Sequence, residues 1–267
     1  MFHNASSLTG MSLDAQDGHI GKIDDIYFDD QNWAVRYVVA DIGFWLLGRK
    51  VLLSPAALHE PKGRSVTVNA TKEQVKKSPD INTAEPVSRK LEEELHDHYS
   101  WPYYWVYPQH YNSLGAAIYP GLSYPSGFPQ PTQKEPFTAK ALEKEKKTEE
   151  KMGQWSIRSA KEVDGYHIQC TDEEIGHVED FIIDTTNWVV RYLIVNTKNI
   201  LPGKKVILAP QWVLGIDWAE TKVFVDVSAE TIVNGPQFEP QTQLDRDFEE
   251  RLYDYYKRPK YWKKKKK

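Results

Sequence analysis

The sequence has a single cysteine, Cys170, among its 267 residues. One cysteine excludes an intramolecular disulfide and a metal site built on cysteines, and it fits a reducing compartment. The residues that follow it, 171–174, are mostly acidic, and acidic neighbours raise the pKa of a thiol rather than activate it. We therefore do not expect Cys170 to be a nucleophile.

Long apolar runs are also missing. The longest, such as residues 42–47, are far shorter than the roughly 20 residues that a membrane-spanning helix needs. Residues 1–7 lack the basic and then apolar pattern of a signal peptide. We expect a cytoplasmic protein and leave open a peripheral position at the inner face of the membrane.

The motifs of common enzymes are absent as well. The sequence has no Gly-x-Ser-x-Gly elbow, no P-loop and no Gly-x-Gly-x-x-Gly turn. His96, His98 and His110 suggest a zinc site, but residues two apart on a helix point to different faces, so we expect solvent-exposed histidines. The acidic positions within residues 24–30 do not have the spacing of a calcium loop. We expect no enzyme activity, no cofactor and no metal.

What the sequence does contain is an internal repeat. Residues 20–39 recur as residues 175–194, and equivalent positions, such as Trp33 and Trp188, are 155 residues apart. After a hairpin that is two residues longer in the second copy, the separation becomes 157. Each copy alternates short segments rich in aromatic and β-branched residues with loops rich in Gly, Pro, Asp and Asn, which predicts β-strands and turns.

An amphipathic helix follows the predicted strands in both copies. Apolar residues recur every four positions, and Ser88 is placed to cap the first of these helices. A capping box from Thr71 to Gln74 predicts a short helical turn before it. Residues 8–13, at the start of the first copy, are expected to be extended. The apolar helix positions are Val87, Leu91, Leu95 and Tyr99 in the first copy, and Leu244, Phe248, Leu252 and Tyr256 in the second.

The repeated motif resembles that of the PRC-barrel family. It reads Gly21-Lys-Ile-Asp-Asp-Ile26 with Trp33 to Tyr37, and again Gly176-His-Val-Glu-Asp-Phe181 with Trp188 to Tyr192. The resemblance implies two tandem small antiparallel PRC-type β-barrels. Together with the helices predicted above, it gives a mainly β fold in which each barrel is followed by an amphipathic α-helix. The family is typified by the cytoplasmic domain of the photosynthetic reaction-centre H subunit and by the C-terminal domain of the ribosome maturation factor RimM.

The repeat also predicts the domain organisation. We expect a first barrel with its helix in residues 1–105 and a second in residues 153–262. Residues 106–152 are first rich in Tyr, Pro and Gly and then charged, which is typical of a linker. Residues 263–267 form a lysine tip. The two units could pack against each other as an intramolecular pseudo-dimer, or each helix could cover its own barrel.

Residues that the two copies share are expected to be structural. A glycine inside a strand marks a bulge or a close approach of backbones. For the shared aspartate and arginine we weigh a repeated binding pair against a salt bridge or turn-fixing contact between adjacent strands, and favour the latter. The tryptophans are expected to pack at the barrel rim. These signature residues are Gly21, Asp25, Trp33, Arg36, Gly176, Asp180, Trp188 and Arg191.

The last residues of the chain are basic and aromatic, although the net charge of the whole chain is −4. Such a segment can bind phosphates and stack on bases, can lie on an anionic membrane surface, or can be a solubilising tail. The candidate residues for binding an anionic partner are Lys257, Arg258, Lys260, Tyr261, Trp262, Lys263, Lys264 and Lys265.

Together these patterns predict a non-catalytic adaptor that docks on protein or membrane-surface partners, resembling the H-subunit domain. A RimM-like factor associated with RNA or the ribosome is the alternative.

Overall fold

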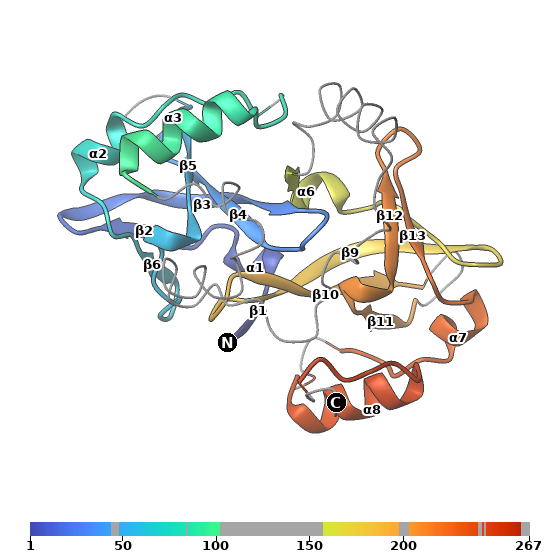
Figure 1. Ribbon diagram of the computed structural model, residues 1–267. Helices are drawn as coiled ribbons and strands as arrows, with labels where there is room; N and C mark the ends of the chain where they lie inside the picture. Colours follow the sequence, from blue (N-terminus) through green and yellow to red (C-terminus); the bar gives the residue numbers. More distant parts are fainter. Residues whose placement is uncertain are drawn as a thin grey trace, which may run out of the picture.

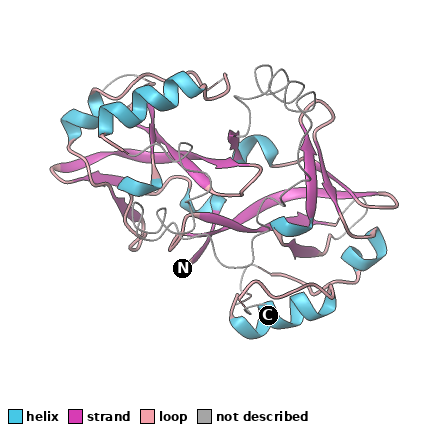
Figure 2. Cartoon of the chain, viewed as in Figure 1, coloured by secondary structure: helices cyan, strands magenta, loops and turns pink. Residues whose placement is uncertain are grey.

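The structure is a computed structural model that describes residues 1–43, 48–83, 85–101, 157–197, 203–239, 242 and 244–262. It is mainly β, with two sheets, as the sequence predicts (Figures 1 and 2). The elements of the first half are β1 (Phe2–Asn4), α1 (Ala5–Leu8), β2 (Ser12–Ala15), β3 (Gly18–Asp29), β4 (Val35–Asp41), β5 (Lys50–Leu53), η1 (Pro55–Ala57), β6 (Ser65–Thr67), α2 (Lys72–Lys76) and α3 (Arg89–Tyr99).

The second half repeats this order with one additional strand, β12. Its elements are β7 (Ile157–Ser159), α6 (Ala160–Val163), β8 (His167–Gln169), β9 (Glu174–Asp184), β10 (Val189–Asn196), β11 (Lys205–Leu208), η3 (Pro210–Trp212), β12 (Val213–Asp217), β13 (Lys222–Val225), α7 (Ala229–Val233) and α8 (Arg246–Tyr255).

The two sheets have matching strand orders. The first runs β5-β4-β3-β2-β6 and the second runs β11-β10-β9-β8-β13-β12. In both, one pair is parallel, β2 with β6 and β8 with β13, whereas the sequence led us to expect antiparallel pairing throughout. A long connection separates the partners of each parallel pair, as parallel pairing requires. Among the described strands, each sheet is an open path rather than a closed ring.

Each sheet also receives a strand from the other half of the chain. β1 pairs with β9 in the second sheet, and β7 pairs with β3 in the first. The registers are equivalent, because Phe2 lies opposite Asp184 and Ile157 lies opposite Asp29, with 155 residues between corresponding positions. In Figure 1, β1 lies beside the strands of the second half. The two halves therefore exchange their first strands reciprocally.

The halves meet at a pseudo-two-fold axis. Ala34 forms an antiparallel bridge with Val189, its own equivalent in the repeat. On either side, the backbone N–H of Val35 donates to the carbonyl of Trp188, and the N–H of Val190 donates to the carbonyl of Trp33, both at 2.8 Å. The expectation of an intramolecular pseudo-dimer agrees with this arrangement.

One apolar core extends through both halves. The rings of Phe28 and Phe181 are 5.3 Å apart, and Trp33 stacks on Phe28 at 5.4 Å. Each long helix covers one sheet, and α3 and α8 lie on opposite sides of the molecule (Figure 1). The helix α3 buries Leu95 against Tyr37 and neighbouring residues of the first sheet. Ser88 caps α3 and Thr71 begins a capping box in α2, as predicted.

The prediction for residues 8–13 is wrong in its first part. Leu8 ends the helix α1, and the chain turns through Gly10, which has a φ of 83°, before β2 begins at Ser12. This helix is four residues long and has no side-chain cap at Asn4. Asp180 accepts a hydrogen bond from the first turn of α1 and is more than 170 residues away in sequence. Local sequence patterns therefore give no sign of this contact.

Candidate docking site and signature residues

The two signature glycines lie where backbones approach closely. Gly21 has a φ of 144°, and a side chain there would collide with the carbonyl oxygen of Asp41. Gly176 has a φ of 39° and faces the carbonyl of Asn196 in the same way. Both positions exclude a side chain and have dihedrals that glycine tolerates best. The predicted close approach is therefore present in both halves.

Asp25 binds to the beginning of a helix in the other half of the chain. Its carboxylate accepts from the hydroxyl of Ser159 at 2.6 Å and from the backbone N–H of Lys161, in α6, at 3.3 Å. Burial raises the pKa of Asp25, although these hydrogen bonds act in the opposite direction. The aspartate thus stabilises the contact between halves, because it supplies acceptors for the open first turn of a helix.

Asp180 makes the reciprocal contact. It accepts from the backbone N–H of Ser6 at 3.1 Å and from the hydroxyl of Ser6 at 2.5 Å, in the first turn of α1. The expectation that the signature aspartate pairs with the signature arginine is wrong in both copies. The helical partners of Asp25 and Asp180 belong to the opposite half, so the repeat alone did not identify them.

The signature arginines bind a different aspartate, at the end of the preceding strand. Arg36 lies 2.7 Å from Asp29, and both side chains are less than 10% exposed. Burial on its own would raise the pKa of Asp29, but the Arg36 guanidinium and the hydrogen bond from Asn32 outweigh it and lower the pKa. The carboxylate also accepts from the backbone N–H of Gln31 at 2.8 Å. This ion pair fixes the β3–β4 turn.

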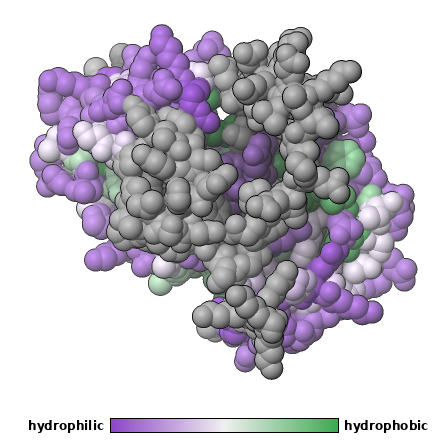
Figure 3. Space-filling model, in the orientation of Figure 1, coloured by the Kyte–Doolittle hydropathy of each residue, from purple (hydrophilic) through white to green (hydrophobic). Residues whose placement is uncertain are grey.

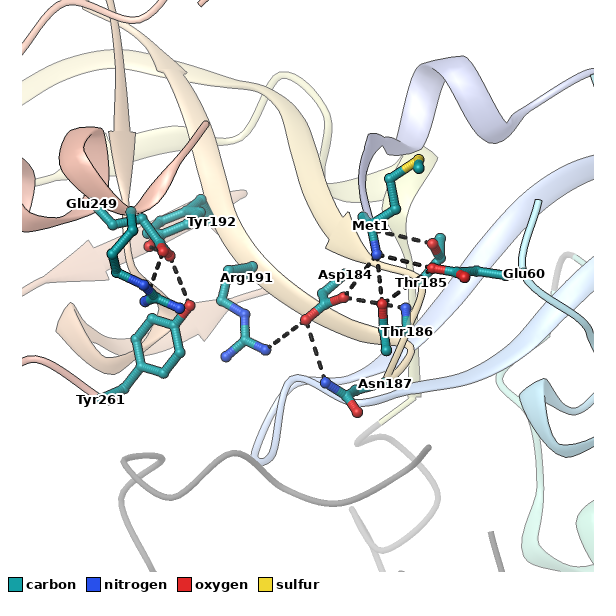
Figure 4. Close-up of polar contacts among 11 residues, drawn as sticks. Met1, Glu60, Asp184, Thr185, Thr186, Asn187, Arg191, Tyr192, Glu249 and Tyr261 are labelled. Carbon is teal, nitrogen blue, oxygen red and sulfur yellow. Dashed lines mark hydrogen bonds and ion pairs between the residues drawn. The ribbon is translucent and has the colours of Figure 1, made fainter. Parts of the chain in front are cut away.

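The second half repeats this ion pair. Arg191 lies 3.0 Å from Asp184, and Asn187 donates to the same carboxylate at 3.3 Å (Figure 4). Burial again opposes ionisation, and Arg191 lowers the pKa of Asp184 despite it. The backbone N–H of Thr186 donates to the other carboxylate oxygen. The signature arginines therefore do fix turns, but their acids are Asp29 and Asp184 and not the predicted Asp25 and Asp180.

The signature tryptophans complete these turns. Trp33 and Trp188 have φ values of 58° and 51°, in the left-handed region that is uncommon for residues other than glycine. Both side chains are buried, at 5% and 4% exposure. Their carbonyl groups accept hydrogen bonds from the other half, so the tryptophans lie in the contact between the halves rather than on an open surface.

Most of the basic segment that the structure describes folds back on the second half. Arg258 pairs with Asp226 at 3.0 Å, and Lys260 pairs with Asp254 at 2.9 Å. Lys257 is exposed. Binding of an anionic partner by this segment stays a prediction, and Lys263, Lys264 and Lys265 lie outside the described residues.

The two aromatic residues of the segment pack on α8. Tyr261 is 9% exposed, and its hydroxyl donates to Glu249 at 2.7 Å (Figure 4). Trp262 lies under the guanidinium of Arg246, at 4.2 Å. Base stacking on Tyr261 would require this packing to open.

Residues 2–75 match the family model of the PRC-barrel domain. A search of curated proteins found no match.

The PRC-barrel match runs from β1 to α2, so it contains the first set of signature residues. The family resemblance is thereby confirmed for the first half. The match ends before α3 and does not include the second half. Within the matched segment, Asp25 contacts the other half of the chain, and Arg36 fixes the β3–β4 turn.

Beyond the PRC-barrel segment, sequence reasoning missed a buried glutamate on each long helix. Glu249 is 2% exposed and accepts from the hydroxyl of Tyr192 at 2.6 Å. In the first half, Glu92 accepts from Tyr37 at 3.0 Å. Each glutamate also pairs with an arginine three residues earlier, at 2.6 Å in α3 and 2.8 Å in α8. These contacts attach each helix to its sheet.

A sequence signal for these anchors was available. The tyrosine closes the repeated Val-Arg-Tyr motif, and an Arg-x-x-Glu spacing occurs at equivalent places in both helices. Glutamate is rarely buried, so this spacing by itself indicates an ion pair on the helix and not a buried contact with the sheet.

The prediction of solvent-exposed histidines is wrong for His96. Its side chain is buried at 1% exposure, 3.2 Å from the hydroxyl of Tyr37 and edge-on to Trp101. His98 is partly exposed and lies 2.8 Å from the carbonyl of Gln74. His110 lies outside the described residues.

Groups for metal binding or nucleophilic chemistry are sparse in the part of the chain that the structure describes. No cluster of three or more His, Cys, Asp or Glu residues suited to a metal occurs there. Cys170 is buried, and burial, together with Asp172 and Glu173, raises the pKa of its thiol to about 12. None of the described helices is long and apolar enough to cross a membrane.

Proposed function

We propose that this protein is a non-catalytic adaptor in which two PRC-type units, joined in one chain, dock on a protein or membrane-surface partner. The observation that carries the proposal is the use of the signature residues. Asp25, Asp180 and both tryptophans make contacts between the halves, so the repeated motif builds a scaffold and leaves the outer surface for partners. The PRC-barrel match of residues 2–75 agrees with this role.

The proposal treats the second half as a second PRC-type unit. Its support is the matching strand order of the two sheets and the equivalent registers of the exchanged strands. On this basis we propose units at residues 1–105 and 153–262, a linker at 106–152 and a basic tip at 263–267. Because the units exchange strands, they form one rigid platform rather than two independent modules.

Co-purification from native cells tests the adaptor role. The full-length protein, tagged and recovered under mild salt, should retain a stoichiometric partner that the tag alone does not retain. We expect the adaptor in the recovered complex to show no catalytic turnover. A protein that emerges alone and turns over a substrate robustly would refute the proposal. We propose that the complex forms in the cytoplasm or at the inner membrane face.

A RimM-like association with RNA or the ribosome is a second candidate, favoured by the five consecutive lysines at residues 263–267. Lysines that neutralise phosphates give affinities that fall with salt, with a log–log slope of about 0.7 per contact on single strands. Replacing the five lysines with serines should flatten this slope. The matched control reverses the charge of Lys62 and Lys77, two exposed lysines of the first half. This control should leave the salt dependence of RNA binding unchanged. No RNA binding at low salt would exclude this candidate.

A further inference from the structure

One hairpin has a strand in the second half that the first half lacks. In the second half it forms the strand β12, which is the last strand of its sheet. In the first half the equivalent segment, residues 58–62, makes only isolated bridges, Leu58 with Val68 and Lys62 with Ser65. That segment contains Pro61, and proline and charge are common means of blocking a sheet edge. The strand β12 has no proline.

Among the described strands, β12 pairs with β13 alone, and the strand is mostly apolar. Leu214 is 70% exposed, and Gly215 is also exposed, with open space where a side chain would lie. A β-bulge between Val213 and Gly215 leaves Leu214 without a partner on β13. Asp217 is the strand's only charged residue. Figure 3 shows small apolar areas, separated by polar residues, near the right-hand border of the visible face.

The hairpin is held in place by contacts at its tip. Asp217 accepts from the backbone N–H groups of Ala219 and Glu220, both at 2.9 Å. Trp218 lies under the guanidinium of Arg158, 3.7 Å away. Arg158 belongs to the exchanged strand β7 and also pairs with Asp30 of the first half, at 3.1 Å. An edge fixed in this way loses little conformational freedom when a partner binds.

The charges around the edge are mainly negative. Glu174 and Glu220 both pair with Lys222, at 3.5 and 3.3 Å, and Asp217 adds a third carboxylate. Glu174 also lies 3.4 Å from His167, and Arg158, which pairs with Asp30, is the other cation near the hairpin tip. A second copy of this hairpin would bring the same carboxylates together, which opposes pairing between two copies. A segment with basic residues beside its apolar centre would be attracted instead.

We propose that β12 is a docking edge that takes an extended peptide segment of a partner protein, with apolar residues over Leu214 and lysine or arginine beside the Asp217 turn. The unpaired N–H and C=O groups of an edge strand select an extended backbone. This inference rests on the adaptor function and names the surface that the adaptor uses.

A synthetic peptide tests the site on the full-length protein. The probe alternates valine and threonine and carries two lysines at each end, and a control peptide carries glutamates in their place. The lysine peptide should bind and slow the hydrogen exchange of amides in Val213–Asp217, and the glutamate peptide should not. Leu214→Lys should weaken binding by about tenfold or more, whereas Val233→Lys, at an exposed apolar position of α7, should leave it unchanged.

Equal binding by wild type and Leu214→Lys, or no protection of β12, would overturn the inference, and so would a dimer formed through β12. Because Leu214 is exposed, both variants should keep the wild-type melting temperature. The native partner separates this inference from the adaptor function. If Leu214→Lys still co-purifies with the wild-type partner, β12 is not the docking edge, but the protein remains an adaptor.

Discussion

Replacing Asp25 with alanine tests whether the repeated aspartate joins the halves or serves a partner. The residue is 7% exposed. Its carboxylate accepts from the hydroxyl of Ser159, from the backbone N–H of Lys161 and from the N–H of Ile26, at 2.6, 3.3 and 2.7 Å. Alanine removes the acceptor for all three donors at once.

The expected loss of stability is large. A buried donor left without an acceptor costs about 1–3 kcal/mol. Ser159 is partly exposed, so water can replace one acceptor, and we expect a total loss of about 3–4 kcal/mol. For a chain of this size the melting temperature falls by about 2–4 °C per kcal/mol. Burial of the charged carboxylate is unfavourable, as the raised pKa of Asp25 shows. Asparagine keeps an acceptor and carries no charge, so Asp25→Asn should cost less than Asp25→Ala.

Urea unfolding, followed by circular dichroism, measures these losses. Asp180→Ala is the matched variant in the other half, and because Asp180 is only partly buried, its loss should be smaller. The structural reading fails if Asp25→Ala unfolds at the wild-type urea concentration but no longer retains its partner. That result would make the aspartate a binding residue.

Three further predictions concern other parts of the scaffold. Gly176→Ala should lower the free energy of unfolding by more than about 1 kcal/mol, because the added carbon meets a carbonyl; an unchanged urea midpoint would contradict the close approach. Tyr192→Phe removes a donor to buried Glu249 and should cost about 1–3 kcal/mol, with faster hydrogen exchange in α8, whereas equal exchange would show that the helix is held otherwise. The pKa of Asp184 is lower in the folded protein than its ordinary value of 3.8. The ionised carboxylate therefore stabilises the fold above that value, and this stabilisation is lost as the pH falls below it. Asp184→Asn should therefore flatten the acid side of the stability profile, and an unchanged profile would exclude a role for the Arg191 pair.

Much of the fold could be predicted from local patterns. The repeat, the strands around Trp33 and Trp188, and the caps at Thr71 and Ser88 follow from residues close together in sequence. The close approach at Gly21 could be predicted because a glycine recurs inside a strand.

The contacts between halves could not be predicted in this way. A repeat states that two segments are equivalent but not which copy each strand joins. The backbone N–H that Asp25 binds in Lys161 is 136 residues away, and β1 is only three residues long, too short for a periodic pattern. The buried Glu92 and Glu249 contradict the usual exposure of glutamate, which tertiary contacts with tyrosine and arginine override.

Cleavage of the linker tests the central claim most directly, which is that the two halves form one scaffold through exchanged strands. A protease site placed within residues 106–152 would cut the chain, and light scattering after size exclusion would give the mass of the product. The reciprocal pairing of β1 with β9 and β7 with β3 predicts that both fragments remain together at the full mass until they are denatured. Two separate folded fragments under native conditions would contradict the account.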